Sequence, residues 1–127
     1  MTTTAFVRTG WILSGLLAAF LAFSAGIKFT GHSSVAETLN TLGWPADAGL
    51  ALGILEAAIL VLYVIPRTAV FGAVLLTGLL GGAMATHVRA DSPLFSHILF
   101  GLYMGLFAWG GLWLRDPRLR ALLPFRT

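Results

Sequence analysis

Cysteine is absent from this chain of 127 residues. Disulfides, thiol chemistry and cysteine-ligated zinc or iron–sulfur centres within the chain are therefore excluded. Charged residues are scarce as well, because they make up 10% of the chain, whereas a soluble domain usually carries about 25%. So few charges cannot cover the surface of a water-soluble domain, and we expect the chain to be surrounded by lipid.

Fingerprints of common enzyme and nucleotide-binding sites are also missing. The sequence contains neither a glycine-rich nucleotide fingerprint nor a Gly-x-Ser-x-Gly motif. The net charge of +3 comes from basic residues that flank apolar runs. This position indicates that they set the orientation of the chain in a membrane and do not bind nucleic acid. The sequence therefore predicts no catalytic residue, no metal site and no nucleic-acid partner, and it identifies no cofactor.

Hydrophobic residues make up 57% of the chain and are gathered in four long runs. A transmembrane helix needs about 20 apolar residues, within a range of about 17–25. The runs predict four transmembrane helices, at 10–27, 47–65, 68–88 and 94–114. Short connections make neighbouring helices antiparallel. We therefore expect one all-α domain over 1–127, an integral membrane four-helix bundle with compact packing.

Two shorter segments are expected to lie at the membrane surface. Segment 33–42 has apolar residues at helical spacing and can begin with Ser33 as its N-cap. Segment 116–124 has Asp116 as a candidate N-cap and Pro117 at the first helical position. Its leucines would enter the inner leaflet while its arginines meet anionic headgroups.

The distribution of basic residues predicts the orientation in the membrane. Cytoplasmic loops carry an excess of lysine and arginine. With both termini in the cytoplasm, only Lys28 and Arg89 lie on the outer side. The arginines on the inner side are then Arg8, Arg67, Arg115, Arg118, Arg120 and Arg126. The sequence therefore favours an N-in, C-in topology.

Glycine spacing indicates how the helices pack. Lipid tails are as apolar as leucine, so membrane helices associate through the close approach of small residues. Three of the predicted spans carry a Gly-x-x-x-Gly spacing, at Gly49/Gly53, Gly78/Gly82 and Gly101/Gly105. We expect these faces to hold the helices together. A glycine face that does not pack within the chain would suit the interface of a homodimer or of a larger membrane complex.

An ionisable residue, Glu56, lies in the middle of the second span, where a charge costs at least about 2.5 kcal/mol. Helical spacing places it on one face with Gly49 and Gly53. Antiparallel packing would bring it to the depth of Thr77 and Tyr103, whose hydroxyls are candidate hydrogen-bond donors. No cation is expected at that depth, which favours the protonated acid. Glu56 is therefore either a neutral structural acid or part of a proton relay or ligand site.

Four basic side chains are expected near the outer ends of the spans: Lys28, His87, Arg89 and His97. We expect them to form, with Glu56 as the floor, an outward-facing polar pocket for a small ligand or a quinone headgroup. The alternative is an ordinary hydrated interface. A haem held by the two histidines, or a zinc ion held by them and Asp91, rests on spacing alone and is not favoured.

The sequence also contains several segments of distinctive composition. They are Phe-Ser-Ala-Gly-Ile-Lys-Phe at 23–29, Leu-Gly-Trp-Pro at 42–45, Gly-Ile-Leu-Glu at 53–56, and longer stretches at 62–73, 77–89 and 113–120. Together these segments resemble the DoxX-like family of small four-helix membrane proteins. The resemblance implies a bacterial-type inner (plasma) membrane location. It draws attention to Lys28, Glu56, His87 and Arg89, and it implies that Pro66 and the two residues after it form a structural turn.

The resemblance implies little about activity. The family name comes from a membrane subunit linked to thiosulfate:quinone oxidoreduction, one relative is associated with oxidative-stress complexes, and distant eukaryotic relatives look like assembly factors. We expect a non-catalytic accessory subunit or a binder of a small hydrophobic or quinone-like ligand. Its expected partners are the lipid bilayer, a quinone or lipid ligand, and a second copy or a larger membrane complex. Two alternatives stay open: a component of a quinone-linked membrane oxidoreductase, and a small oligomeric transporter or channel.

Overall fold

The structure is a computed structural model that describes residues 3–45 and 47–126. Every regular element in these ranges is helical, so the predicted all-α fold is confirmed there. The α-helices are α1 Thr3–Phe29, α2 Ser33–Thr41, α3 Ala48–Val64, α4 Ala69–Arg89, α5 Phe100–Arg115 and α6 Pro117–Leu122. A short π-helical turn, η1, covers Leu94–Ile98.

The long helices overlap the predicted spans, but α1 begins at Thr3, well before the predicted span of 10–27. Three stretches are long and apolar enough to cross a membrane, namely Thr3–Phe29, Ala69–Arg89 and Leu94–Arg115. The helix α3 is shorter, and its 17 residues extend about 25 Å at about 1.5 Å per residue. That length is at the lower end of the range of about 17–25 residues for a spanning helix. One difference is that the fourth span begins with the π turn η1 instead of a continuous α-helix.

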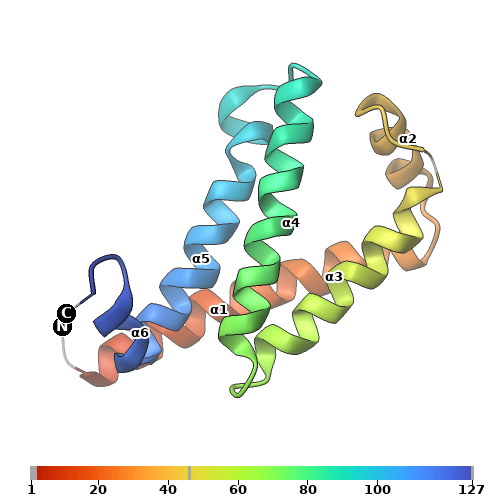
Figure 1. The fold of residues 1–127 in the computed structure, drawn as a ribbon. Helices are drawn as coiled ribbons and strands as arrows, with labels where there is room; N and C mark the ends of the chain where they lie inside the picture. Colours follow the sequence, from red (N-terminus) through yellow and green to blue (C-terminus); the bar gives the residue numbers. More distant parts are fainter. Residues whose placement is uncertain (1–2, 46, 127) are drawn as a thin grey trace.

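The long helices form two antiparallel pairs, α1 with α3 and α4 with α5 (Figure 1). The helix α1 also packs against α5, and α4 also packs against α3. In Figure 1 the two pairs meet where α5 crosses α1 and where the chain turns from α3 into α4. They diverge toward the ends that carry α2 and η1. The predicted compact packing is therefore found at one end of the bundle and not at the other.

Small residues explain why α1 and α5 meet closely at one end. A Cβ added to Gly10 would lie 2.6 Å from the carbonyl oxygen of Gly111, and a Cβ added to Gly111 would collide with Ser14. Gly10 and Ser14 thus form a small-x-x-x-small face that packs on a glycine. The Gly-x-x-x-Gly spacing alone does not reveal this crossing, because a serine stands in place of the second glycine.

Two of the three predicted glycine faces pack within the chain. A Cβ added to Gly53 would lie 2.9 Å from the Cβ of Lys28, and one added to Gly101 would lie 2.6 Å from a side chain of α4. In contrast, a Cβ added to Gly78 or Gly82 would meet no atom within 4 Å. The prediction that this third face packs was therefore wrong for contacts within the chain.

The core lies where the four long helices meet. Its most deeply buried large side chains are Leu17, Leu21, Ile59, Tyr63 and Leu76. Because lipid surrounds the helices in a membrane, these side chains stabilise the fold through close packing more than through exclusion of water. Many other large apolar side chains face outward, as expected for helices in contact with lipid.

The helix ends confirm one predicted cap and correct another. Asp116 caps α6 and Pro117 is its first residue, as predicted. The N-cap of α2 is His32 instead of Ser33, because the backbone N–H of Ser34 donates to His32 Nδ1 at 3.1 Å. A neutral imidazole nitrogen accepts this bond as a serine oxygen would. The prediction of Ser33 was therefore wrong by one residue.

Candidate functional site

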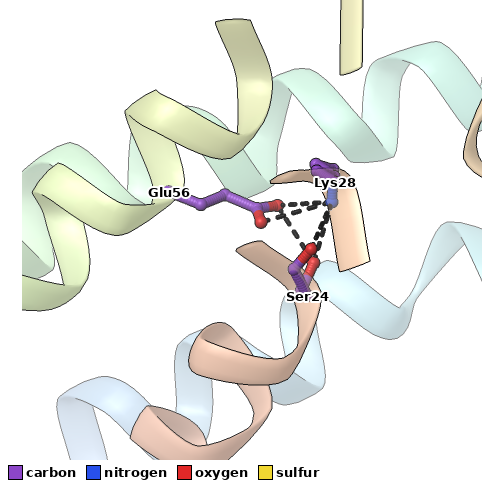
Figure 2. A network of polar contacts seen from close by, with 3 residues as sticks. All are labelled: Ser24, Lys28 and Glu56. Carbon is purple, nitrogen blue, oxygen red and sulfur yellow. Dashed lines mark hydrogen bonds and ion pairs between the residues drawn. The ribbon is translucent and has the colours of Figure 1, made fainter. Parts of the chain in front are cut away.

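Glu56 of α3 forms an ion pair with Lys28 of α1, as Figure 2 shows. Lys28 Nζ lies 3.1 Å from Glu56 Oε1 and 3.2 Å from Oε2. The Lys28 and Glu56 side chains are only 16% and 13% exposed. The expectation that no cation lies at the depth of Glu56 was therefore wrong.

Helix direction explains how the two side chains meet. The Cα–Cβ bond of every helical residue tilts toward the N-terminus of its helix. Lys28, in the last turn of α1, therefore leans back along α1, while Glu56 leans toward the start of α3. Since the two helices are antiparallel, the tilts bring the charged groups together. The sequence placed Lys28 at the outer interface because only its backbone position was considered. The tilt of its side chain and the reach of its four-carbon stem bring its ammonium deeper.

Ser24, one turn before Lys28 on α1, completes the site (Figure 2). Lys28 Nζ donates to Ser24 Oγ at 2.8 Å, and Ser24 Oγ donates to Glu56 Oε1 at 3.3 Å. Lys28 Nζ also lies 3.5 Å from the carbonyl oxygen of Ser24, so the three donors of the ammonium group share four oxygen acceptors. Sequence reasoning missed Ser24 as a site residue. The available signal was a serine four residues before a lysine on the same face of an apolar helix.

The energetics of this pair make it a candidate functional site. A charge inside a membrane is costly, and ionisable residues in membrane helices usually mark a binding or conduction site. Two buried charges offset part of each other's desolvation, but an apolar pair of equal volume is often as stable. The stability of the fold alone therefore does not explain why Lys28 and Glu56 occupy these positions.

A cleft of about 310 Å³ adjoins the ion pair, between α1, α2 and α3. Its walls include Lys28, Phe29, His32, Val35, Asp47 and Leu50. The cleft wall thus combines polar and apolar residues, and Lys28 belongs both to the cleft wall and to the ion pair. This arrangement suits a ligand with a polar headgroup and an apolar body.

The structure divides the predicted outer pocket into two groups. Lys28 and Glu56 form the ion pair, while His87 and His97 lie together at the α4–η1 end, with ring centroids 5.5 Å apart. Arg89 is exposed in the last turn of α4. The two groups belong to different helix pairs, and these pairs diverge at the ends concerned (Figure 1).

Thr77 and Tyr103, which were expected near Glu56, make their hydrogen bonds elsewhere. Trp109 Nε1 donates to Thr77 Oγ1 at 2.7 Å, which ties α5 to α4. Tyr103 OH donates to the carbonyl oxygen of Phe95 at 3.0 Å, which ties α5 to η1. The role of both residues in ligand binding stays a prediction.

A second polar network, which the sequence did not reveal, joins α1, α3 and α5. Tyr63 OH donates to the carbonyl oxygen of Ala108 at 2.7 Å and lies 2.8 Å from Ser14 Oγ. Arg115 Nη2 donates to Ser14 Oγ at 2.9 Å. Since the Tyr63 proton is directed to the carbonyl, the Ser14 hydroxyl donates to Tyr63. Tyr63 is 2% exposed and Ser14 4%, so this network lies inside the protein.

Comparison with known proteins identifies one family. The model of the DoxX-like family matches residues 12–111. The matched range begins in α1, ends in α5 and includes Ser24, Lys28 and Glu56. No curated protein and no solved structure matches the chain.

Proposed function

Since this chain, with its apolar helices, is an integral membrane protein that belongs to the DoxX-like family, we propose that it is a non-catalytic accessory subunit that binds a small hydrophobic or quinone-like ligand. The observation that carries the proposal is the dual position of Lys28. Its ammonium group is held by Glu56 and Ser24, and its side chain also forms part of the cleft wall.

The chemistry of the cleft favours a polar headgroup that accepts hydrogen bonds. A quinone carbonyl is such an acceptor, and the ammonium of Lys28, a residue of the cleft wall, can donate to it in exchange for one of its present bonds to Ser24 or Glu56. Phe29, Val35 and Leu50 supply apolar surface for a ring or the first part of a tail. The volume of about 310 Å³ lies at the small end of the usual range of about 300–1,000 Å³ for ligand sites. The cleft therefore suits a headgroup whose tail extends into lipid.

The α1–α3 seam supports binding over transport. The network of Ser24 and Glu56 lies toward one end of this seam, and the network of Ser14 and Tyr63 lies toward the other. Between them Leu17 and Ile59 are 0% and 1% exposed. A ladder of polar groups, which a conduction path along this seam would need, is interrupted there. A redox role would require a bound chromophore or a redox partner, because the chain has no cysteine.

The location and the partners belong to the same proposal. The excess of arginine near both termini supports an N-in, C-in topology in a bacterial-type inner membrane. An accessory subunit needs a partner chain, which would be a second copy or a larger membrane complex. The face of α4 around Gly78 and Gly82 is open to such a partner, since a Cβ added to either glycine would meet no atom of the described residues within 4 Å.

The test is photolabelling of the purified protein in detergent with a short-chain benzoquinone that carries a photoreactive group. Leu50 lines the cleft and is 57% exposed, so Leu50→Trp should fill the cleft without touching the ion pair. Ile54 is one turn further along α3 and 56% exposed, so Ile54→Trp is the matched control on a lipid-facing position.

Labelling of the cleft residues should fall several-fold in Leu50→Trp and stay unchanged in Ile54→Trp. Equal labelling of both variants, or labelling that maps away from Phe29 and Val35, would show that the cleft is not the binding site.

A further inference from the structure

The histidine pair at the α4–η1 end has no role in the proposed ligand site. His87 lies in the last turn of α4, His97 lies in η1, and their ring centroids are 5.5 Å apart with an interplanar angle of 70°. We propose that His87 and His97 together bind a first-row transition metal ion of the kind that prefers imidazole, such as copper(II), through their Nε2 atoms. This site is separate from the cleft at Lys28, so each proposal can fail without the other.

Each histidine is held by a serine hydroxyl at its other nitrogen. His87 Nδ1 lies 2.9 Å from Ser92 Oγ, and His97 Nδ1 lies 2.7 Å from Ser96 Oγ. Histidines that ligate metals usually donate their second ring N–H to an oxygen acceptor, which fixes the tautomer and the ring orientation. When Nδ1 donates to the serine, Nε2 keeps the lone pair that a metal needs. The two serine hydroxyls thus offer an acceptor to each ring in the tautomer that binds metal.

The spacing of the rings also fits a shared ion. With metal–nitrogen bonds of about 2.0–2.1 Å, two imidazoles on one ion have ring centroids roughly 4.5 Å apart as cis ligands of a square-planar ion and roughly 5 Å apart on a tetrahedral ion. The observed 5.5 Å is slightly longer than both values, so binding would draw the two rings together by about 0.5–1 Å.

The π turn positions the second histidine. In η1 the backbone N–H of Ile98 donates to Pro93 O and that of Leu99 to Leu94 O, both with a spacing of five residues. Tyr103 OH fixes this turn from α5 through its bond to Phe95 O. Single π turns within α-helical segments are frequently found at functional sites. This turn carries His97 and changes the register of the residues that precede α5.

The remaining coordination positions would be filled from outside the pair. Among residues 3–45 and 47–126, no group of three or more His, Cys, Asp or Glu side chains is close enough to hold a metal ion. Water, or a group from a partner, would therefore complete the shell. The exposed Arg89 lies two residues after His87 and lowers the affinity for any cation, whereas Asp91 in the same connection acts in the opposite sense. We expect a site of moderate affinity that is open to exchange.

The experiment is electron paramagnetic resonance of copper(II) added to the full chain, purified in detergent without a histidine tag and stripped of metals. The variants are His87→Gln, His97→Gln and the double variant. The chain contains its own control in His32, which is exposed, belongs to no pair and accepts the backbone N–H of Ser34 at Nδ1, so that its Nε2 carries the proton. His32→Gln therefore removes a histidine that lies outside the proposed site.

We expect one copper per chain with hyperfine splitting from two nitrogens, and an affinity at least about tenfold weaker in either single variant of the pair. Ser92→Ala, which keeps both ligands, should weaken binding by less. His32→Gln should bind as the wild type does. Equal binding in the wild type and the double variant would overturn the proposal, and so would an equal loss in His32→Gln or the absence of binding to the wild type.

Discussion

Gly53 and Lys28 lie in direct contact across the α1–α3 interface. A Cβ added to Gly53 would lie 2.9 Å from the Cβ of Lys28 and 3.5 Å from the carbonyl oxygen of Ala25. The absence of a side chain at position 53 therefore allows α1 to approach α3 where Lys28 must reach Glu56, one turn further along α3. The ion pair thus depends on a glycine as much as on its two charges.

Gly53→Ala should destabilise the protein by about 1–3 kcal/mol, because the added methyl group overpacks the interface beside the ion pair. Gly15 of α1 is the matched control, since a Cβ there would meet nothing within 4 Å. Unfolding in mixed micelles with increasing SDS measures the difference. If Gly53→Ala and Gly15→Ala unfolded alike, the close approach of α1 and α3 at Gly53 would be refuted.

A double-mutant cycle should reveal coupling between Lys28 and Glu56. A neutral acid would tolerate Glu56→Gln, but here that change leaves the Lys28 ammonium without its carboxylate. Glu56→Gln and Lys28→Met should each cost about 3–5 kcal/mol, as expected when one partner of a buried pair is removed. The double variant should recover a large part of that loss. Strictly additive effects in the same unfolding assay would mean that the pair contributes no interaction.

Tyr63→Phe should destabilise the fold by about 1–2 kcal/mol, because it removes the donor to Ala108 O and leaves the buried Ser14 hydroxyl without an acceptor. Tyr103→Phe is the control, since Tyr103 is 37% exposed and makes one hydrogen bond, to Phe95 O. Its loss should be clearly smaller. A Tyr63→Phe protein as stable as the wild type would show that the network of α1, α3 and α5 is not formed.

The sequence predicted the helices well because their signals are local. Long apolar runs and the Pro66 break specify the spans, and Asp116-Pro117 specifies the start of α6. The interruption of the fourth span was not predictable in this way. The π turn η1 changes the hydrogen-bonding register without changing the composition that marks the span.

The site was only half predictable, because a contact depends on how two helices are rotated and tilted. Glu56 is conspicuous as an acid in an apolar run, but its partner Lys28 lies 28 residues earlier in the chain. Whether Lys28 reaches Glu56 depends on the glycine at position 53 and on the tilt of the Lys28 and Glu56 side chains. The same reason explains why Arg115 was predicted only to lie on the inner side of the membrane, while the contact of its guanidinium with the buried Ser14 was not predicted.

The proposed site depends on a charged Glu56 that holds the Lys28 ammonium. Infrared difference spectroscopy of the wild type against Glu56→Gln, in reconstituted lipid, detects this charge. We expect the variant to lose a carboxylate stretching band, and Lys28→Met to convert this band into the carbonyl stretch of a protonated acid. If Glu56→Gln instead removed only the carbonyl stretch of a protonated acid from the wild-type spectrum, Glu56 would be neutral and the ion pair would not exist.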